Sequence, residues 1–202
     1  MSLKNLKING KINFQIIIQF ILNYGVGKGG FIADLASENP NINYIAIEMI
    51  EAMLGIANRK IIDIYKQKDL KKENILLVRQ NIDYIDQIFG SKDKVDRIYI
   101  NFCNPWPRVK HNKRRLTHET KLQKYRDFLS KDGEIYFKTD DLELFNDTKK
   151  YLKVEGFKII NSTEDIDKID IFNPNIETEH ERMFKNANLK IKALIAKGGK
   201  KW

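Results

Sequence analysis

Residues 101–116, "NFCNPWPRVKHNKRRL", combine side chains that could hold a nucleic-acid base. Pro105 and Pro107 flank Trp106 and restrict the backbone, so the indole and the amide of Asn104 should occupy defined positions. An indole face can stack on a base, and an amide offers both a donor and an acceptor. A structural turn that only covers the end of a sheet could use a similar Pro-Trp pair. The basic residues that follow favour the base-binding interpretation.

Those basic residues form a tract, residues 108–126, with eight Lys or Arg and one acid, Glu119. Solvated helix faces normally mix both signs of charge, so this tract predicts contact with phosphates. A net charge of +9 also suggests a polyanionic partner. No Cys/His spacing typical of zinc occurs, and we expect no metal. The expected phosphate contacts are Lys110, His111, Lys113, Arg114 and Arg115.

A glycine cluster, "GVGKGG" (25–30), lies between an apolar run at 14–22 and a helical pattern at 31–39. Glycines allow a tight turn and let a ligand lie against the backbone, with the N-terminus of the next helix behind it. Four glycines in six residues favour a nucleotide-type ligand. The pattern alone fits NAD and S-adenosylmethionine equally well.

Polar residues also follow the other apolar runs. Glu48 could accept hydrogen bonds from both ribose hydroxyls of an adenosine, although it could also be an ordinary surface acid. Asn81 could bond the exocyclic amine of adenine, whereas Asp83 is expected to be the N-cap of the next helix. Asp140 and Asp141 could cap a helix, and an acid at that point could also accept the N1 and N2 hydrogens of guanine.

Strand and helix patterns alternate along the chain, which predicts right-handed βαβ units and a mostly parallel sheet. The expected strands are 14–22, 44–48, 74–78, 95–102, 133–139, 157–162 and 189–196. The expected helices are 31–39, 52–65, 83–89, 117–129 and 141–154. Ligands of such sheets bind beyond the carboxyl ends of the strands. We expect one domain, 1–202, in which the polar segment 164–187 is a loop on the substrate side. Within that segment, Thr178 and Glu181 have the spacing of a capping box.

Cysteine content and hydropathy bear on location. The single cysteine, Cys103, excludes an intramolecular disulfide and favours a reducing cytoplasm. The apolar run at 14–22 is too short to span a bilayer, and Gln15 and Gln19 interrupt it. We therefore interpret it as a buried first strand rather than as a signal peptide, and we expect no membrane association.

Taken together, these motifs resemble the bacterial tRNA (guanine-N7)-methyltransferase family. The resemblance rests on "GVGKG", "NPNINYIAIE", "GEIYFKTD" and "TEHE", and above all on "DRIYINFCNPWPRVKHNKRRLT". It implies an α/β, Rossmann-like class I methyltransferase fold, with helices on both faces of a mostly parallel sheet and an antiparallel C-terminal strand. It also implies S-adenosylmethionine as methyl donor and nitrogen 7 of guanine 46 in the tRNA variable loop as acceptor. The protein would act as a monomer or homodimer.

The resemblance also implies roles for single residues. The implied donor-binding residues are Asn23, Gly25, Gly27, Gly29, Glu48, Asn81 and Asn104. Asn104 is also the implied catalytic residue. The implied substrate-binding residues are Trp106, Arg108, Asp140, Thr178, Glu179, His180 and Glu181.

The chain departs from the family pattern at several of these positions. Amides at Asn23, Asn81 and Asn104 stand where the family usually has acids, and Arg108 and His180 stand where Lys and Tyr are usual. Residues 1–22 are shorter than in the family and atypical. Nitrogen 7 of guanine has a lone pair and no proton, so methyl transfer does not require a general base, and positioning can supply much of the acceleration.

Three other functions are compatible with parts of this pattern. A degenerate relative could bind tRNA without methylating it, as the three amides suggest. An Asn-Pro-aromatic turn also serves methylation of exocyclic amines. A nucleotide-dependent dehydrogenase fits the glycine cluster but not the basic turn.

Overall fold

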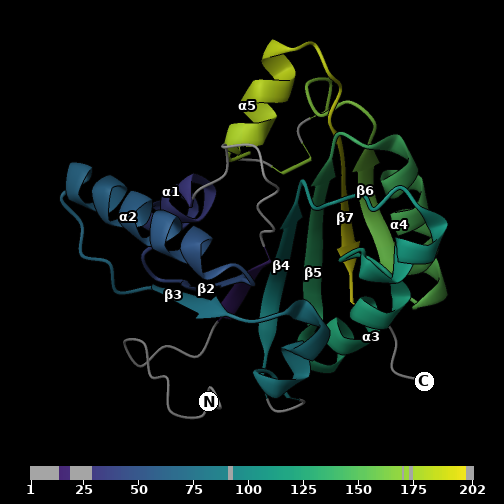
Figure 1. The fold of residues 1–202 in the computed structure, drawn as a ribbon, viewed down its shortest axis with the longest axis horizontal. Helices are drawn as coiled ribbons and strands as arrows, with labels where there is room; N and C mark the ends of the chain where they lie inside the picture. The colour runs from purple at the N-terminus through teal and green to yellow at the C-terminus, as the bar shows by residue number, and fades with distance from the viewer. Residues whose placement is uncertain (1–13, 19–28, 91–92, 170, 173–174, 199–202) are drawn as a thin grey trace.

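A seven-stranded sheet with the order β3-β2-β1-β4-β5-β7-β6 forms the centre of the computed structural model (Figure 1). The structure describes residues 14–18, 29–90, 93–169, 171–172 and 175–198. The strands are β1 (Phe14–Ile18), β2 (Asn43–Glu48), β3 (Ile75–Arg79), β4 (Val95–Asn101), β5 (Leu129–Thr139), β6 (Lys158–Thr163) and β7 (Lys192–Lys197). The first five strands pair in parallel, and β7 runs antiparallel to both β5 and β6. The expected mostly parallel sheet with an antiparallel C-terminal strand is confirmed.

Helices cover both faces of this sheet. The α-helices are α1 (Gly30–Glu38), α2 (Glu51–Gln67), α3 (Glu119–Phe128), α4 (Leu142–Val154) and α5 (Glu179–Asn186). Two 3-10 helices are η2 (Ile82–Gln87) and η3 (Val109–Arg114). The first four α-helices lie where the sequence predicts helices. The pattern at 83–89 forms the 3-10 helix η2 instead of an α-helix, and neither η3 nor α5 was expected from periodicity.

The apolar residues of the strands alternate because each face packs against its own helices. Ile45 and Ile47 on β2 join a core cluster that contains Leu122 of α3 and Leu144 of α4. Tyr44, the neighbour of Ile45, belongs to a second cluster with residues of α1 and α2. Successive side chains of a strand point to opposite faces, so this division follows from the period of the strand.

Two helix starts at the carboxyl edge of the sheet are fixed by side chains. The oxygen Oδ1 of Asn81 accepts a hydrogen bond from Asp83 N at 2.9 Å, so Asn81 is the N-cap of η2. The prediction that Asp83 fills this role is wrong, because the helix begins one residue before it. Asp141 caps α4 by accepting from Leu144 N at 2.6 Å, which leaves Asp140 outside the cap.

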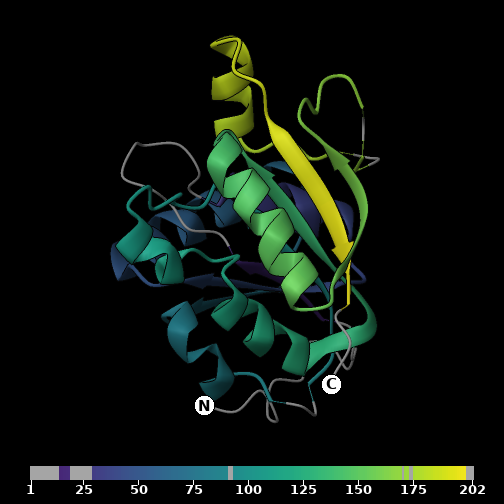
Figure 2. The ribbon, with the colours of Figure 1, turned by 90° about the vertical axis from the view of Figure 1, so that its right-hand side faces the viewer.

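The carboxyl ends of β4 and β5 lie side by side because the strands pair in parallel. Helix α5 lies beyond these ends, and the view from the side places it on the same edge (Figures 1 and 2). Among the described residues, no helix is both long and apolar enough to cross a membrane. The exits of β2, β3, β4 and β5 lie at one edge of the sheet, because these strands all run parallel.

Candidate functional site

The exit of β4 forms a tight turn whose backbone is fixed by its own side chains. Oδ1 of Asn104 accepts a hydrogen bond from Trp106 N at 2.9 Å. Phe102 and Trp106 have φ values of 49° and 45°. Such left-handed conformations are unfavourable for residues with a Cβ by roughly 1–2 kcal/mol each, so surrounding contacts must hold them. The amide and the indole thus have defined places at this edge.

Cationic side chains of η3 surround the indole. The guanidinium of Arg114 lies over the Trp106 ring at 5.0 Å, and the His111 ring meets it edge-on at 5.7 Å. Arg108, Lys110 and Lys113 are exposed and form no ion pair with any residue that the structure describes. A partly exposed aromatic ring with uncompensated cations nearby can accept a base and its phosphates.

Arg115 does not belong to this exposed set, and its burial argues against the predicted phosphate contact. Its side chain is 1% exposed and pairs with Asp147 at 2.6 Å and with Glu143 at 2.9 Å. Three other cations of the tract also pair with acids of distant elements: Lys121 with Asp83, Lys124 with Asp86, and Arg126 with Glu155. The tract is nearly pure cation in sequence only, because the fold supplies its counter-ions from elsewhere.

The exits of β2 and β3 place a carboxylate and an amide at the same edge. Glu48 is 6% exposed, and its Oε1 accepts from Ile50 N at 2.8 Å, which fixes the carboxyl group at the end of β2. Asn81 follows β3 next to it, and Gln80 N donates to Glu48 O at 3.1 Å. This pair is suited to the ribose and base of an adenosine, because a fixed carboxylate can accept two hydroxyl hydrogens.

Of the glycines implied to bind the donor, Gly29 lies within the described residues. It is the N-cap of α1 with φ 96°, and a Cβ added there would lie 2.9 Å from the Cα of Ala57 in α2. Gly29 is therefore required by backbone conformation and by helix packing. The predicted Asn23, Gly25 and Gly27 lie outside the described residues.

Helix α5 begins with the predicted capping box. Thr178 accepts from Glu181 N at 3.0 Å, and Glu181 accepts from Thr178 N at 3.4 Å. Thr178 is 1% exposed and Glu181 is fully buried, which favours a role in holding α5 over the predicted contact with substrate. Lys138 of β5 pairs with Glu181 at 2.7 Å and with Asn175 Oδ1 at 2.6 Å. Sequence reasoning missed Lys138, although a lysine between Phe and Thr at the end of an apolar strand was a signal for a buried cation.

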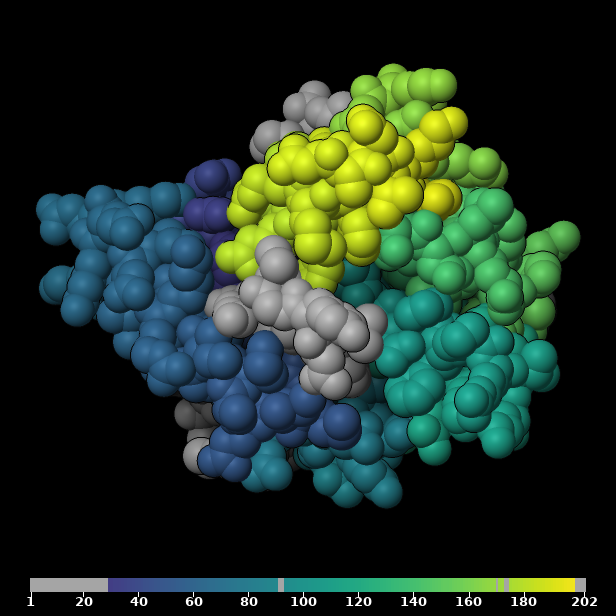
Figure 3. Space-filling view, turned by 45° about the horizontal axis from the view of Figure 1, so that its top comes forward, coloured from purple at the N-terminus to yellow at the C-terminus, as the bar shows by residue number. Residues whose placement is uncertain are grey.

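Glu179 and His180, which lie between Thr178 and Glu181, are placed near the carboxyl edge of the sheet. The His180 ring stacks on Phe102 with centroids 5.7 Å apart and planes at 20°. The Glu179 carboxyl group lies at the start of α1, since a Cβ on Gly30 would be 3.2 Å from its Oε1. In the space-filling view, α5 lies between α2 on one side and the segments that carry η3 and α4 on the other (Figure 3).

Asp140 and His180 influence each other's ionisation. Burial lowers the pKa of His180, while the charge of Asp140 acts in the opposite direction. Desolvation raises the pKa of the Asp140 carboxyl group, with a further increase from the neighbouring Asp141 and an opposing effect of Lys192 and His180. An acid with a raised pKa at a strand exit is a common feature of functional sites.

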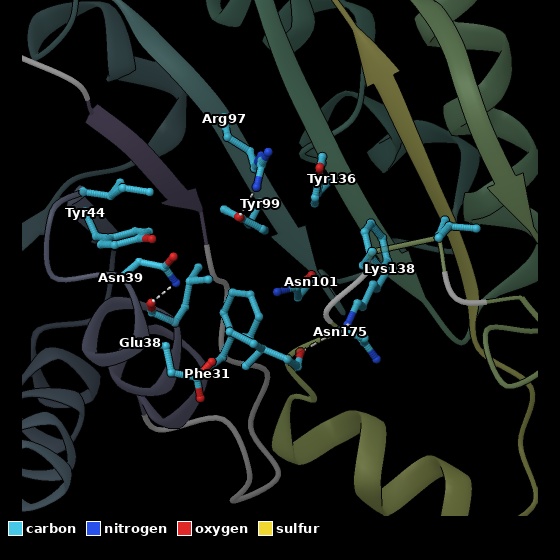
Figure 4. A pocket seen from close by; sticks show the side chains of 15 residues that line it. Phe31, Glu38, Asn39, Tyr44, Arg97, Tyr99, Asn101, Tyr136, Lys138 and Asn175 are labelled. Carbon is cyan, nitrogen blue, oxygen red and sulfur yellow. Dashed lines mark hydrogen bonds between the residues drawn. The ribbon is translucent and has the colours of Figure 1, made fainter. Parts of the chain in front are cut away.

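A cavity of about 320 Å³ lies on the face of the sheet covered by α1. Figure 4 shows Tyr99, Tyr136 and Lys138 projecting from β4 and β5 toward Phe31 of α1. None of the predicted site residues lines it. Because Lys138 lines this cavity and also pairs with Glu181, the cavity adjoins the ion pair that supports α5. Within the described parts of the chain, no group of three His, Cys, Asp or Glu is arranged to hold a metal ion.

Comparison with solved structures supports the fold. An antibiotic related methyltransferase matches with a TM-score of 0.57 at 20% identity, covering 92% of this chain and 87% of that one. The Methanococcus jannaschii fibrillarin pre-rRNA processing protein matches with a TM-score of 0.56 at 17% identity, covering 94% and 69%. At such identities the likeness establishes the class I methyltransferase fold alone.

Comparison by sequence is more specific. The family model described as a putative methyltransferase matches residues 19–194. The tRNA (guanine-N(7)-)-methyltransferase of Clostridium beijerinckii is 51% identical over 175 residues, which cover 87% of this chain and 80% of the relative. The enzyme of Clostridium perfringens is also 51% identical, over 176 residues with the same coverage. With the glycine cap, the fixed Glu48 and the Asn-Pro-Trp turn in place, the chain belongs to the tRNA (guanine-N(7)-)-methyltransferase family.

Proposed function

We propose that this protein transfers a methyl group from S-adenosylmethionine to nitrogen 7 of guanine 46 in the variable loop of tRNA. The observation that carries the proposal is the Asn104–Trp106 turn, which lies with exposed cations on one side and Asp140 and His180 on the other. The identity of about half of the residues with curated enzymes of this activity favours catalysis over the alternative of tRNA binding alone. We place the reaction in the cytoplasm, with the protein a monomer or homodimer.

The described residues fit the methyl donor. Glu48 would accept the ribose hydroxyls, since its carboxyl group is held at the strand end by Ile50 N. Asn81 would face the adenine, beside the exposed apolar side chains of Met49 and Ile50. When bound, S-adenosylmethionine supplies a methyl group activated by the sulfonium. Asn104, at the next exit, would orient the amino acid end of the donor and the acceptor base.

The acceptor base is assigned to the space between the turn and α5. Trp106 offers a stacking face, and ionised Asp140 can accept the N1 and N2 hydrogens that distinguish guanine from adenine. Nitrogen 7 needs no deprotonation, so the residues must orient the ring rather than act as a base. Glu179 and His180 would complete the pocket from α5, while Thr178 and Glu181 hold this helix from inside.

The tRNA backbone would follow the exposed cations of η3. The proposed phosphate contacts are Arg108, Lys110, His111, Lys113 and Arg114, since they lie on η3 or directly before it and two of them, His111 and Arg114, contact the indole. Each phosphate neutralised should steepen the salt dependence of binding by about 0.7 to 0.9 in log K per log unit of salt.

The test is methyl transfer from labelled S-adenosylmethionine to two unmodified tRNA transcripts, one with guanine and one with adenine at position 46. The expected result is label in the guanine transcript only, recovered as 7-methylguanosine. Label in an exocyclic amine would instead favour the amine-methylating alternative. No label in either transcript, together with salt-sensitive tRNA binding, would establish the binding-only alternative.

A further inference from the structure

Arg115 differs from every other cation of η3 and its flanks in being enclosed by protein. It is the largest side chain among the fully buried residues of the described chain, at 1% exposure. A guanidinium keeps its charge in such a place only when acceptors surround it. The acceptors of Arg115 therefore show which parts of the fold the buried guanidinium joins.

Hydrogen-bond acceptors surround the guanidinium, and two of them are main-chain carbonyls of the Asn104–Trp106 turn. Nε donates to Pro105 O at 2.6 Å, and Nη2 donates to Trp106 O at 3.4 Å. On the opposite side, Nη1 donates to Asp147 at 2.6 Å and Nη2 to Glu143 at 2.9 Å, both on α4. Arg115 thus links the turn that follows β4 to the helix that follows β5.

The turn is held at its start by Phe102 N, which donates to Lys138 O of β5 at 2.8 Å, and at its far end by Arg115. It begins and ends with left-handed residues, Phe102 and Trp106, a conformation that residues with a Cβ rarely adopt. The planar fork of arginine can satisfy two carbonyls and two carboxylates at once, and the ammonium of lysine cannot reproduce that geometry.

We propose that Arg115 is a positioning residue: it ties the Asn104–Trp106 turn to α4, fixes the amide and the indole for methyl transfer, and makes no phosphate contact. The inference rests on the proposed function of the turn. The inference gives Arg115 a different role from its neighbour Arg114. The guanidinium of Arg114 is exposed and lies over the indole ring of Trp106.

The experiment compares Arg115→Lys with two other variants of the same tract. Arg126→Lys is the matched control, since Arg126 also pairs with a buried acid, Glu155, but lies on α3 and binds the segment after α4. Lys113→Met is the reference for lost phosphate contact. The measurements are the single-turnover methylation rate at saturating tRNA and the salt dependence of tRNA binding.

Arg115→Lys should lower the methylation rate by about 10- to 100-fold, because small misplacement of reacting groups has effects of this size. The salt slope of tRNA binding should stay at the wild-type value, whereas Lys113→Met should reduce it by about 0.7 to 0.9. Arg126→Lys should leave the rate unchanged. A slope reduced by Arg115→Lys as much as by Lys113→Met, or an unchanged rate, overturns the inference.

Two further measurements keep the inference testable if Arg115→Lys does not fold or if the wild type is inactive. Asp147→Asn loosens the same guanidinium from α4 and should reproduce the slower rate with an unchanged slope; a wild-type rate would contradict the inference. In a Trp202→Phe background, the emission of Trp106 should change in Arg115→Lys and remain unchanged in Arg126→Lys. A wild type that methylates no transcript defeats the proposed function, while this emission comparison still decides whether Arg115 positions the turn.

Discussion

Asn104 combines a structural and a proposed catalytic role in one side chain. Its Oδ1 holds Trp106 N, so a replacement that keeps an oxygen there should keep the turn. Methylation of nitrogen 7 makes the purine ring cationic, and a carboxylate stabilises that charge better than an amide does. We therefore predict that Asn104→Asp raises the single-turnover methylation rate, by roughly tenfold.

The control for this prediction is Asn104→Ala, which removes the acceptor and should lower the rate by about 100-fold, the loss typical of one preorganised polar group. Both variants should melt within a few degrees of the wild type. A slower Asn104→Asp enzyme would mean that the amide NH₂ group is required, for example as a donor to the substrate.

Asp140 should impose an acid limb on the pH profile. Only the ionised carboxyl group can accept the two guanine hydrogens, and desolvation raises the pKa of this group. The activity should therefore fall, as the pH decreases, at a higher pH than the ordinary aspartate value of about 3.9. The measurement is kcat/KM for tRNA as a function of pH, for the wild type and Asp140→Asn.

Asp140→Asn should show a lower plateau without that limb, since its amide does not titrate. The groups that face Asp140 are Asp141, Lys192 and His180. His180→Phe keeps a ring on Phe102 but removes the histidine as a source of the limb. A limb that survives in Asp140→Asn and disappears in His180→Phe would assign it to the histidine.

At the scale of elements, α5 depends on one buried ion pair. Lys138 is 5% exposed and Glu181 is fully buried, and burial lowers the pKa of Lys138 while Glu181 opposes this. Lys138→Met leaves the buried Glu181 charge with the more distant Lys185, at 3.6 Å, so we expect a loss of about 3–5 kcal/mol in the free energy of unfolding. Chemical denaturation measures it.

A double-mutant cycle separates this pair from general damage. Lys138→Met with Glu181→Leu should be less destabilised than Lys138→Met alone, because no buried charge remains. The exposed pair Arg79 and Glu51 is the matched control, with an expected coupling of about 0.2–1 kcal/mol. A coupling for the buried pair no larger than the control would contradict its role in holding α5.

Substitution of two glycines by alanine should change the free energy of unfolding in opposite directions, because Gly29 lies at the contact between α1 and α2 and Gly55 does not. Gly29→Ala should destabilise by roughly 1–3 kcal/mol, because φ is 96° and the new Cβ would lie 2.9 Å from Ala57 Cα. Gly55→Ala, on the exposed part of α2, should stabilise by about 0.5–1 kcal/mol, since the nearest atom would be Arg59 Nη1 at 3.9 Å. Thermal denaturation compares both, and a tolerated Gly29→Ala would contradict the packing.

How well each element could be predicted from the sequence depends on its length and on how regularly its apolar residues recur. The strands and α1 to α4 have clear apolar periods, so their positions were predicted to within a few residues. Helix α5 has only eight residues, and its one local signal was the box of Thr178 and Glu181. The partners of Arg115 and Lys138 could not be predicted, because Asp147 and Glu181 meet them only when the sheet forms. Exposure therefore separates Arg114 from Arg115, which no local pattern distinguishes.

The excess positive charge of the molecule is not spread evenly over its surface. Four of the eight cations of the tract are compensated by acids of η2, α4 and the segment after α4. The other four, Arg108, Lys110, Lys113 and Arg114, lie on η3 or directly before it. The proposed binding face is therefore the region where counter-ions are missing, which only the folded chain determines.

Binding of the donor product should be visible in the stability of the whole protein. S-adenosylhomocysteine at about 100 times its Kd should stabilise the fold by about 2.7 kcal/mol if it binds only the folded state. For a chain of this length, that corresponds to an increase in Tm of roughly 5–10 °C. Removing the charge in Glu48→Gln should weaken binding by about 1.5–3 kcal/mol, so the same concentration should give less than about half of that shift.

Glu51→Gln is the matched control, because Glu51 lies three residues away with a side chain that is 78% exposed and pairs only at the surface. Its shift should equal that of the wild type. An equal shift in Glu48→Gln would mean that the carboxylate at the end of β2 does not bind the ribose. No shift in the wild type at concentrations that saturate related enzymes would place the loss at the donor site, and the protein would then hold tRNA without methylating it.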